Sequence, residues 1–192
     1  MTQPTQPSAT AVEDGNGWIA SVPPEHATGA LAEAYQTQAE KIGRVTELTQ
    51  IGSLYPALVA ARLNLYAVVD ATPSDVPDHV RRVVALLTSV LNGCLFCTVG
   101  HTEKLTEAGY GELAQAIKAD PEGFATGDPK ADAAVAYARK LVTDPRHIIE
   151  ADVTALREAG WGDLDILDIN NLSAYYSYIN RVAAGLGLQR EA

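Results

Sequence analysis

Two cysteines and one histidine stand at a spacing that could support chemistry. Cys94 and Cys97 form a C-x-x-C pair, and His101 follows four residues after the second cysteine. If this segment is helical, positions three and four apart share one face, and the three side chains can meet. Unpaired N–H groups at a helix N-terminus favour a thiolate, and an imidazole can exchange protons near neutral pH. The spacing therefore predicts a thiol redox site with His101 as its proton shuttle.

A pair of thiols of this kind could reduce a hydroperoxide. One sulfur attacks the O–O bond and becomes a sulfenic acid, which the second thiol condenses into an intramolecular disulfide. The net reaction converts ROOH into ROH. A partner dithiol must then restore both thiols by exchange.

The same residues leave two other interpretations open. Cys94, Cys97 and His101 are three-quarters of a zinc site, for which His79 or an acidic residue would have to supply the fourth ligand. The two cysteines could instead be inert and buried, because free cysteine often packs in cores. A c-type haem attachment is excluded, since Thr98 and not histidine follows the second cysteine.

The segment before the cysteines has the strongest helical periodicity of the chain. Between residues 77 and 91, apolar side chains recur at steps of three and four, which predicts a helix with one face toward a core. These side chains are Val80, Val83, Val84, Leu87, Val90 and Leu91. A second, mixed face borders either a cleft or solvent and carries His79, Arg82, Leu86 and Ser89. Gly93 ends this helix, because glycine adopts positive φ at little cost, and a new helix is predicted from Cys94 to about Ala108.

The remaining periodic segments also predict helices. They cover residues 24–41, 57–69, 131–141, 152–159 and 164–186, and no run of alternating apolar residues indicates a strand. We therefore predict an all-α helical bundle that forms a single domain over residues 17–192. Residues 1–16 are rich in Thr, Gln, Pro and Ser and are predicted to form a disordered arm.

Two features of the C-terminal half suggest structural roles. Trp161 directly follows Gly160 and is expected to be a core or interface aromatic. Asn170 and Asn171 interrupt an otherwise apolar helix, and one of them is expected to hydrogen-bond across a helix pair or a subunit contact.

Charge and composition exclude several classes of partner. The 192 residues carry 14 Lys and Arg against 24 Asp and Glu, a formal net charge of −10, so the protein as a whole repels nucleic acid and anionic membranes. No apolar stretch approaches the ~20 residues of a membrane-spanning helix, and the first residues lack the pattern of a secretory signal. We therefore expect a cytoplasmic protein, in which a C-x-x-C pair indicates redox or metal chemistry.

Residues 82–101, with the sequence RVVALLTSVLNGCLFCTVGH, resemble the core of the alkylhydroperoxidase AhpD-like proteins of the carboxymuconolactone decarboxylase superfamily. The specific elements of this resemblance are Ser89, Asn92, Cys94, Cys97 and His101. Residues 144–145, 156–161, 175–181 and 186–188 are similar to the peroxidase-related branch of that family. The resemblance spans most of residues 20–188.

The resemblance implies an all-helical antioxidant protein that reduces organic hydroperoxides. It implies assembly as a homo-oligomer, commonly a trimer or a multiple of one. It also implies that Cys97 attacks the peroxide with help from His101, and that Cys94 resolves the product. The implied reductant is dihydrolipoamide or a thioredoxin-like dithiol protein, and neither a metal nor another cofactor is implied.

The proton relay of the best-characterised family members is altered in this sequence. A relay glutamate twelve residues before the first cysteine is replaced by Arg82, and a histidine directly before the second cysteine is replaced by Phe96. Arginine stays protonated and cannot act as a general base. One expectation is that Arg82 stabilises a thiolate by its charge, with His79 and Ser89 as candidate auxiliary groups. The alternative is a degenerate site in a weak peroxidase or a non-catalytic oligomeric module.

Overall fold

A computed structural model describes residues 17–188 of the chain, and these residues are helical, without an extended strand. The prediction of an all-α fold is confirmed for this part of the chain. The predicted disordered arm over residues 1–16 lies outside the described residues. Two compact units can be distinguished, one built from residues 17–70 with 185–188 and the other from residues 71–184. One domain over residues 17–192 stays a prediction.

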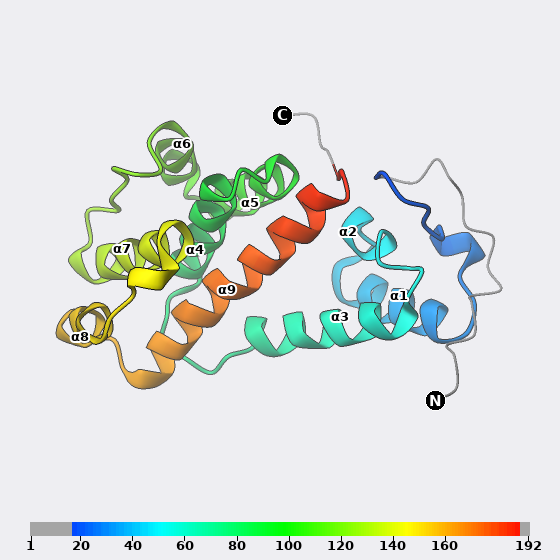
Figure 1. The fold of residues 1–192 in the computed structure, drawn as a ribbon, viewed down its shortest axis with the longest axis horizontal. Helices are drawn as coiled ribbons and strands as arrows, with labels where there is room; N and C mark the ends of the chain where they lie inside the picture. Colours follow the sequence, from blue (N-terminus) through cyan, green and yellow to red (C-terminus); the bar gives the residue numbers. More distant parts are fainter. Residues whose placement is uncertain (1–16, 189–192) are drawn as a thin grey trace. The chain divides into compact units, whose positions relative to one another are not determined.

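The first unit contains three α-helices that follow a short 3-10 turn at Pro24–His26 (Figure 1). They are α1 (Gly29–Ile42), α2 (Glu47–Gln50) and α3 (Pro56–Asp70). Helices α1 and α3 pack around a small core that consists of Val22, Leu31, Ala34, Tyr35 and Val59. The Tyr35 hydroxyl donates to the Val22 carbonyl over 2.7 Å, so the buried ring keeps its polar end satisfied.

The apolar pattern of α3 predicts the helix but not which of its faces is buried. The spacing of its apolar residues predicts the helix, but Leu58, Leu65 and Val68 of that pattern are exposed. Val69 of that pattern is buried, and the other buried side chains of α3 are Val59 and Arg62, whose guanidinium donates to Thr49 over 2.9 Å. The helix is apolar on more than one side, so its sequence alone does not identify the buried face.

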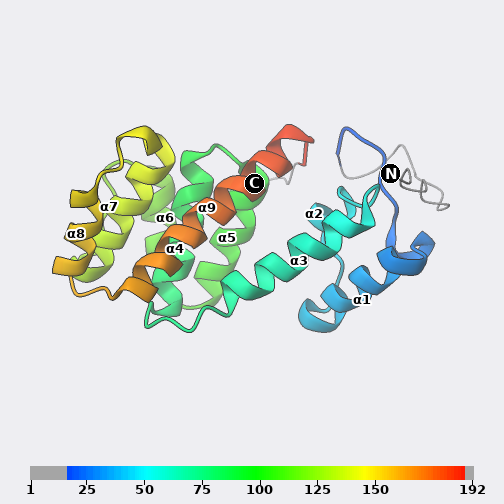
Figure 2. The ribbon, with the colours of Figure 1, turned by 60° about the horizontal axis from the view of Figure 1, so that its bottom comes forward.

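The second unit is organised around α4 (Asp78–Leu91), which packs against α5 (Leu95–Glu107), α6 (Gly111–Ala119) and α7 (Pro129–Thr143) (Figure 2). The apolar stripe of α4 faces a core, as predicted. Its fully buried partners from the neighbouring helices are Leu105, Ala114, Ile117 and Val135. Leu86 and Ser89 are also fully buried, so the mixed face of α4 does not border solvent at these two positions.

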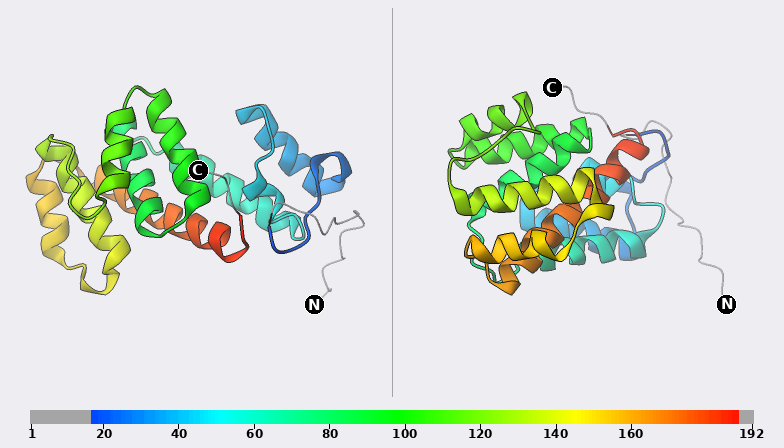
Figure 3. Two further views of the ribbon diagram at one scale, coloured as in Figure 1. Left: turned by 90° about the horizontal axis from the view of Figure 1, so that it is seen from above. Right: turned by 60° about the vertical axis from the view of Figure 1, so that its left-hand side comes forward.

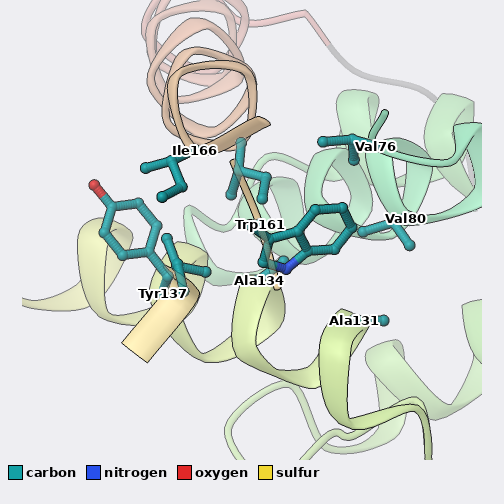
Figure 4. Packing of buried hydrophobic residues seen from close by; sticks show 9 residues of the cluster. Val76, Val80, Ala131, Ala134, Tyr137, Trp161 and Ile166 are labelled. Carbon is teal, nitrogen blue, oxygen red and sulfur yellow. The ribbon is translucent and has the colours of Figure 1, made fainter. Parts of the chain in front are cut away.

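A second core cluster joins α7, α8 (Glu150–Glu158) and the start of α9 (Asp163–Gly185). Helices α7 and α8 lie side by side in both views of Figure 3. Trp161 lies in the middle of this cluster, against Val76, Val80 and Ile166 (Figure 4), which confirms its predicted core role. Its indole N–H donates to the Lys130 carbonyl over 2.9 Å.

Polar contacts tie α9 to the rest of the second unit. The fully buried Asp168 forms a salt bridge with Arg81 of α4 and accepts a hydrogen bond of 2.5 Å from the Ser74 hydroxyl. Tyr137 of α7 donates to Asn170 over 3.0 Å, which confirms the expected bond from one asparagine across a helix pair. These contacts fix the long helix against α4 and α7.

Two helices were not predicted, and both are short. Helix α2 is a single turn, and α6 begins at Gly111 after Tyr110, which provides no side-chain cap. A single turn such as α2 carries too few periodic positions to be recognised, and α6 lacks the capping residue that marks a helix start. Within residues 17–188, none of the helices has the length and apolar character needed to cross a membrane.

Candidate functional site

The backbone at the α4–α5 junction places Cys94 at the start of a helix. The predicted turn at Gly93 has φ +68°, and its N–H donates to the Val90 carbonyl while the Cys94 N–H donates to the Ser89 carbonyl over 3.1 Å. This pair of bonds is the Schellman motif that closes α4. Cys94 is at the same time the N-cap of α5, so both of its neighbouring helices restrain it. The predicted helix from Cys94 to about Ala108 is confirmed.

The two thiols lie together at this helix start. Both are reduced and buried, with exposed fractions of 2% for Cys94 and 6% for Cys97. The Cys97 N–H donates to the Cys94 sulfur over 3.3 Å. Residues three apart on a helical turn have Cβ atoms roughly 5–6 Å apart, which places the pair near the range a disulfide requires.

The two thiols differ in pKa because their environments differ. A hydrogen bond from the Cys97 thiol, with further hydrogen bonds from the Cys97 N–H and Asn180, outweighs burial and lowers the pKa of Cys94 to about 7. The same thiol–thiol hydrogen bond, together with burial, strongly raises the pKa of Cys97. The asymmetric hydrogen bonding of the pair therefore favours ionisation of Cys94 over ionisation of Cys97.

Asn180 of α9 is a site residue that the sequence did not indicate. It is 1% exposed, and its amide nitrogen donates to the buried Ser89 hydroxyl over 3.0 Å. Its carbonyl oxygen accepts from the Asn92 amide over 3.1 Å, and hydrogen bonds from Asn180 lower the pKa of both cysteines. The only signal in the sequence was its place within the family-like segment 175–181. Ser89, a candidate auxiliary group, acts here as a partner of Asn180 and not of a thiol.

His101 lies on α5 one turn after Cys97, in edge-on contact with the Tyr176 ring, 4.6 Å between centroids. Burial, followed by the positive charges of Lys104 and Arg82, lowers the pKa of His101 to about 3. The imidazole is therefore neutral over the physiological pH range. It can accept a hydrogen bond, but it is a weak proton acceptor.

The other two candidate auxiliary groups contact residues other than the cysteines. Arg82 forms a salt bridge with Asp78, one turn earlier on α4, over 2.6 Å. Its charge reaches His101 through space. The His79 ring stacks on Tyr110, with centroids 4.9 Å apart.

The zinc interpretation requires several ligands grouped around one point. Over the described part of the chain, no three side chains among His, Cys, Asp and Glu are grouped closely enough to hold a metal ion. The arrangement at the α4–α5 junction is that of a dithiol with amide hydrogen bonds.

Comparison with known proteins gives a family and a fold. The model of the carboxymuconolactone decarboxylase family matches residues 56–140. No curated protein matches the sequence. Among solved structures, an uncharacterised peroxidase-related protein from Silicibacter sp. TM1040 is 22% identical, with a TM-score of 0.78 over 100% of this chain and 96% of that chain.

Two further structures are similar to this chain. One is the alkylhydroperoxidase AhpD core of a peroxidase-related protein from Ralstonia eutropha JMP134, 23% identical with a TM-score of 0.74 over 84% of this chain and 85% of that chain. The other is the debrominase Bmp8, 20% identical with a TM-score of 0.70 over 84% and 86%. At these identities the structures show a shared fold. That shared fold and the family match over residues 56–140 support the expected resemblance to AhpD-like proteins of the carboxymuconolactone decarboxylase superfamily.

Proposed function

We propose that this protein is a thiol-dependent peroxidase that reduces organic hydroperoxides through a disulfide cycle of Cys94 and Cys97. The observation that carries the proposal is the pairing of the two thiols at the start of α5, where the Cys97 N–H lies 3.3 Å from the Cys94 sulfur. A thiol pKa of about 7 makes a large thiolate fraction available at neutral pH. The match of residues 56–140 to the carboxymuconolactone decarboxylase family model and the fold shared with an AhpD core support the assignment.

The proposed cycle uses two half-reactions. In the first, a thiolate sulfur forms a bond to one peroxide oxygen, the O–O bond breaks, and the alkoxide takes up a proton and leaves as ROH. The second thiol then attacks the sulfenic sulfur, which forms the disulfide and releases water. In the second half-reaction, an external dithiol reduces the disulfide by exchange and is itself oxidised.

The proposal includes the partners of the cycle. Dihydrolipoamide or a thioredoxin-like protein would act as the dithiol reductant. A cytoplasmic setting would keep both cysteines reduced between turnovers, as an antioxidant role requires. We also propose that the chain assembles as a homo-oligomer, a trimer or a multiple of one.

A specific observation favours a second candidate, a non-catalytic helical module. Arg82 occupies the position of the relay glutamate and is paired with Asp78, and His101 is held neutral. Proton transfer in such a site lacks a strong base. This candidate predicts two buried thiols that do not turn over with any dithiol donor.

Mass spectrometry of the reduced, full-length protein tests the proposed peroxidase. One equivalent of cumene hydroperoxide is expected to remove two hydrogen atoms from the chain and to consume both thiols, because the disulfide forms within one polypeptide. The Cys94→Ser and Cys97→Ser variants serve as controls and cannot form that disulfide. Continuous ROH production with dihydrolipoamide or thioredoxin is expected from wild type alone. If both thiols remain reduced after peroxide, the peroxidase assignment is wrong and the non-catalytic module stands.

A further inference from the structure

The backbone presents the Cys94 sulfur, and not the Cys97 sulfur, to the start of α5. As the N-cap residue, Cys94 offers its sulfur as the acceptor for the Cys97 N–H over 3.3 Å. An ionised sulfur is a stronger acceptor than a thiol, and the unpaired N–H groups of a first helical turn favour negative charge. Cys97 lies within the helix, and its N–H is the donor in this capping hydrogen bond.

Asn180 provides a second, independent contact from another helix. Its carbonyl oxygen is committed to the Asn92 amide at 3.1 Å, which fixes the orientation of the carboxamide. The amide nitrogen then donates to the Ser89 hydroxyl over 3.0 Å, and hydrogen bonding from Asn180 also lowers the pKa of both thiols. An amide nitrogen has two hydrogens, so it can donate to Ser89 and to a sulfur at once. Ser89 and Asn92 are positioning residues for this donor.

The thiol of Cys97 completes the environment of Cys94. It donates to the Cys94 sulfur, and this hydrogen bond is the largest influence that lowers the pKa of Cys94. The same bond retains the proton on Cys97. The N–H and the thiol of Cys97 therefore both donate to the Cys94 sulfur, while the Asn180 amide lowers the pKa of both thiols.

Among residues 17–188, the ionisable groups near the dithiol do not include a strong base in place of the relay glutamate. On α5, His101 is neutral and Lys104 is a cation, and on α4, Arg82 is a cation paired with Asp78. From α9, the ring of Tyr176 contacts His101. Stabilisation of the thiolate thus depends on fixed hydrogen-bond donors and not on a proton relay.

We infer that Cys94 is the attacking sulfur and that Asn180 stabilises its thiolate, with Cys97 as the resolving thiol. This inference rests on the proposed peroxidase function and reverses the roles that the family resemblance implies for the two cysteines.

The proton balance of the first half-reaction follows from this assignment. The Cys94 thiolate forms the S–O bond, the O–O bond breaks, and the departing alkoxide takes the proton that Cys97 holds and leaves as ROH. The resulting Cys97 thiolate attacks the Cys94 sulfenic sulfur and expels hydroxide. Hydroxide takes up the proton that Cys94 had earlier released to solvent, which gives water.

Limited alkylation tests the assignment without any peroxide. The reduced full-length protein is treated with substoichiometric iodoacetamide from pH 5 to 9, and fragment ions distinguish adducts on Cys94 from those on Cys97. We expect Cys94 to carry at least about tenfold more adduct at pH 7, with a midpoint near pH 7. Preferential adducts on Cys97 would overturn the inference.

Variants of α9 test the contribution of Asn180. Asn180→Ala removes the donor and is expected to raise the Cys94 midpoint by about one pH unit. Asn180→Asp keeps the shape, can still accept from Asn92, and is expected to raise the midpoint at least as far because an ionised carboxylate cannot donate. The matched control is Asn170→Ala on the same helix, where the asparagine accepts from Tyr137, and its midpoint is expected to stay at the wild-type value. Equal midpoints in all four proteins would contradict the role of Asn180.

Sulfenic acid trapping separates this inference from the peroxidase itself. After peroxide, dimedone is expected to label Cys94 in Cys97→Ser, whose hydroxyl retains a donor, and to label Cys97 in Cys94→Ser more slowly. Faster labelling of Cys97 would reverse the roles while leaving the peroxidase intact. If wild type forms no disulfide with peroxide, the peroxidase fails, and the alkylation results still decide which thiol is acidic.

Discussion

The charge states of individual side chains decide what this dithiol can do. Cys94 and Cys97 are chemically identical residues three positions apart, yet the structure lowers the pKa of one and raises that of the other. The cause is asymmetric hydrogen bonding at a helix start, since the first sulfur accepts from the second residue. His101 shows the opposite effect, because burial and two cations remove its charge. At this site the thiolate is stabilised mainly by neutral donors.

The influence of Arg82 on His101 can be measured directly. Arg82→Gln removes a positive charge and is expected to raise the pKa of His101, by less than about one unit because the Arg82 side chain is 35% exposed and its field is screened. NMR titration of the His101 ring resonances reports this shift. Arg157→Gln, which breaks an exposed ion pair with Asp163, is the matched control and is expected to leave His101 unchanged. An identical His101 titration in wild type and Arg82→Gln would show that the Arg82 charge does not act there.

At the scale of elements, the site depends on a junction where one helix ends and the next begins without a linker. Gly93 closes α4 with positive φ, and the following residue caps α5. Helix α9 supplies Asn180 from outside this local unit, and its salt bridge between Asp168 and Arg81 holds it against α4. The position of the amide donor therefore depends on how α9 is attached.

A side chain at Gly93, in the junction between α4 and α5, is expected to strain the backbone. A Cβ at this position meets no atom within 4 Å, so Gly93→Ala is expected to destabilise the fold through its φ of +68° alone, by about 1 kcal/mol. Gly185→Ala, at the end of α9, also meets no atom within 4 Å and has no positive φ, and it is expected to be neutral or slightly stabilising. Urea unfolding of both variants gives the comparison. Equal stability of the two would argue against a backbone requirement at Gly93.

A buried salt bridge attaches α9 to α4, so the loss of one of its two charges is expected to lower the free energy of unfolding strongly. Arg81→Met leaves the fully buried Asp168 without its cation and is expected to cost about 3–5 kcal/mol of unfolding free energy. The double variant Arg81→Met with Asp168→Leu removes both charges and is expected to recover most of that loss. Arg157→Met, at an exposed ion pair, is expected to change stability by less than about 1 kcal/mol. Urea unfolding measures all three, and a double variant as unstable as Arg81→Met would contradict this account.

At the scale of the whole molecule, the net charge of the chain opposes its assembly into oligomers. Each chain carries a formal charge of −10, so copies of the chain repel one another at low ionic strength. Homo-oligomers must offset this repulsion by burying apolar surface. The exposed large hydrophobic residues, among them Leu58, Leu65 and Val68 of α3, are apolar groups that the described chain does not bury by itself.

The proposed oligomer predicts the molecular mass in solution and the way in which association depends on salt. Sedimentation equilibrium at micromolar concentration is expected to give a trimer of the 20.3 kDa chain or a multiple of it. Because added salt screens like charges, association is expected to strengthen between about 20 and 200 mM NaCl. A mass of one chain at all concentrations and salt levels would exclude the oligomer.

The sequence by itself determined the helical fold and the location of the dithiol. Periodic apolar residues predicted α4, and Gly93 predicted the turn before Cys94, because both signals are local and depend on backbone geometry within one or two turns. The C-x-x-C spacing likewise placed both thiols on one helical turn. The same local signals failed for α2, which is a single turn, and for α6, which begins without a side-chain cap.

Only the tertiary structure decided the hydrogen-bond partners and the protonation states of the site residues. Asn180 lies 91 residues from Ser89 in the chain, and no spacing rule connects them. The salt bridge of Arg82 to Asp78, the neutral state of His101 and the exposed face of α3 likewise depend on which helices pack together. Hydrogen bonds and desolvation act between neighbours in space, whereas the sequence pattern reports only neighbours along the chain.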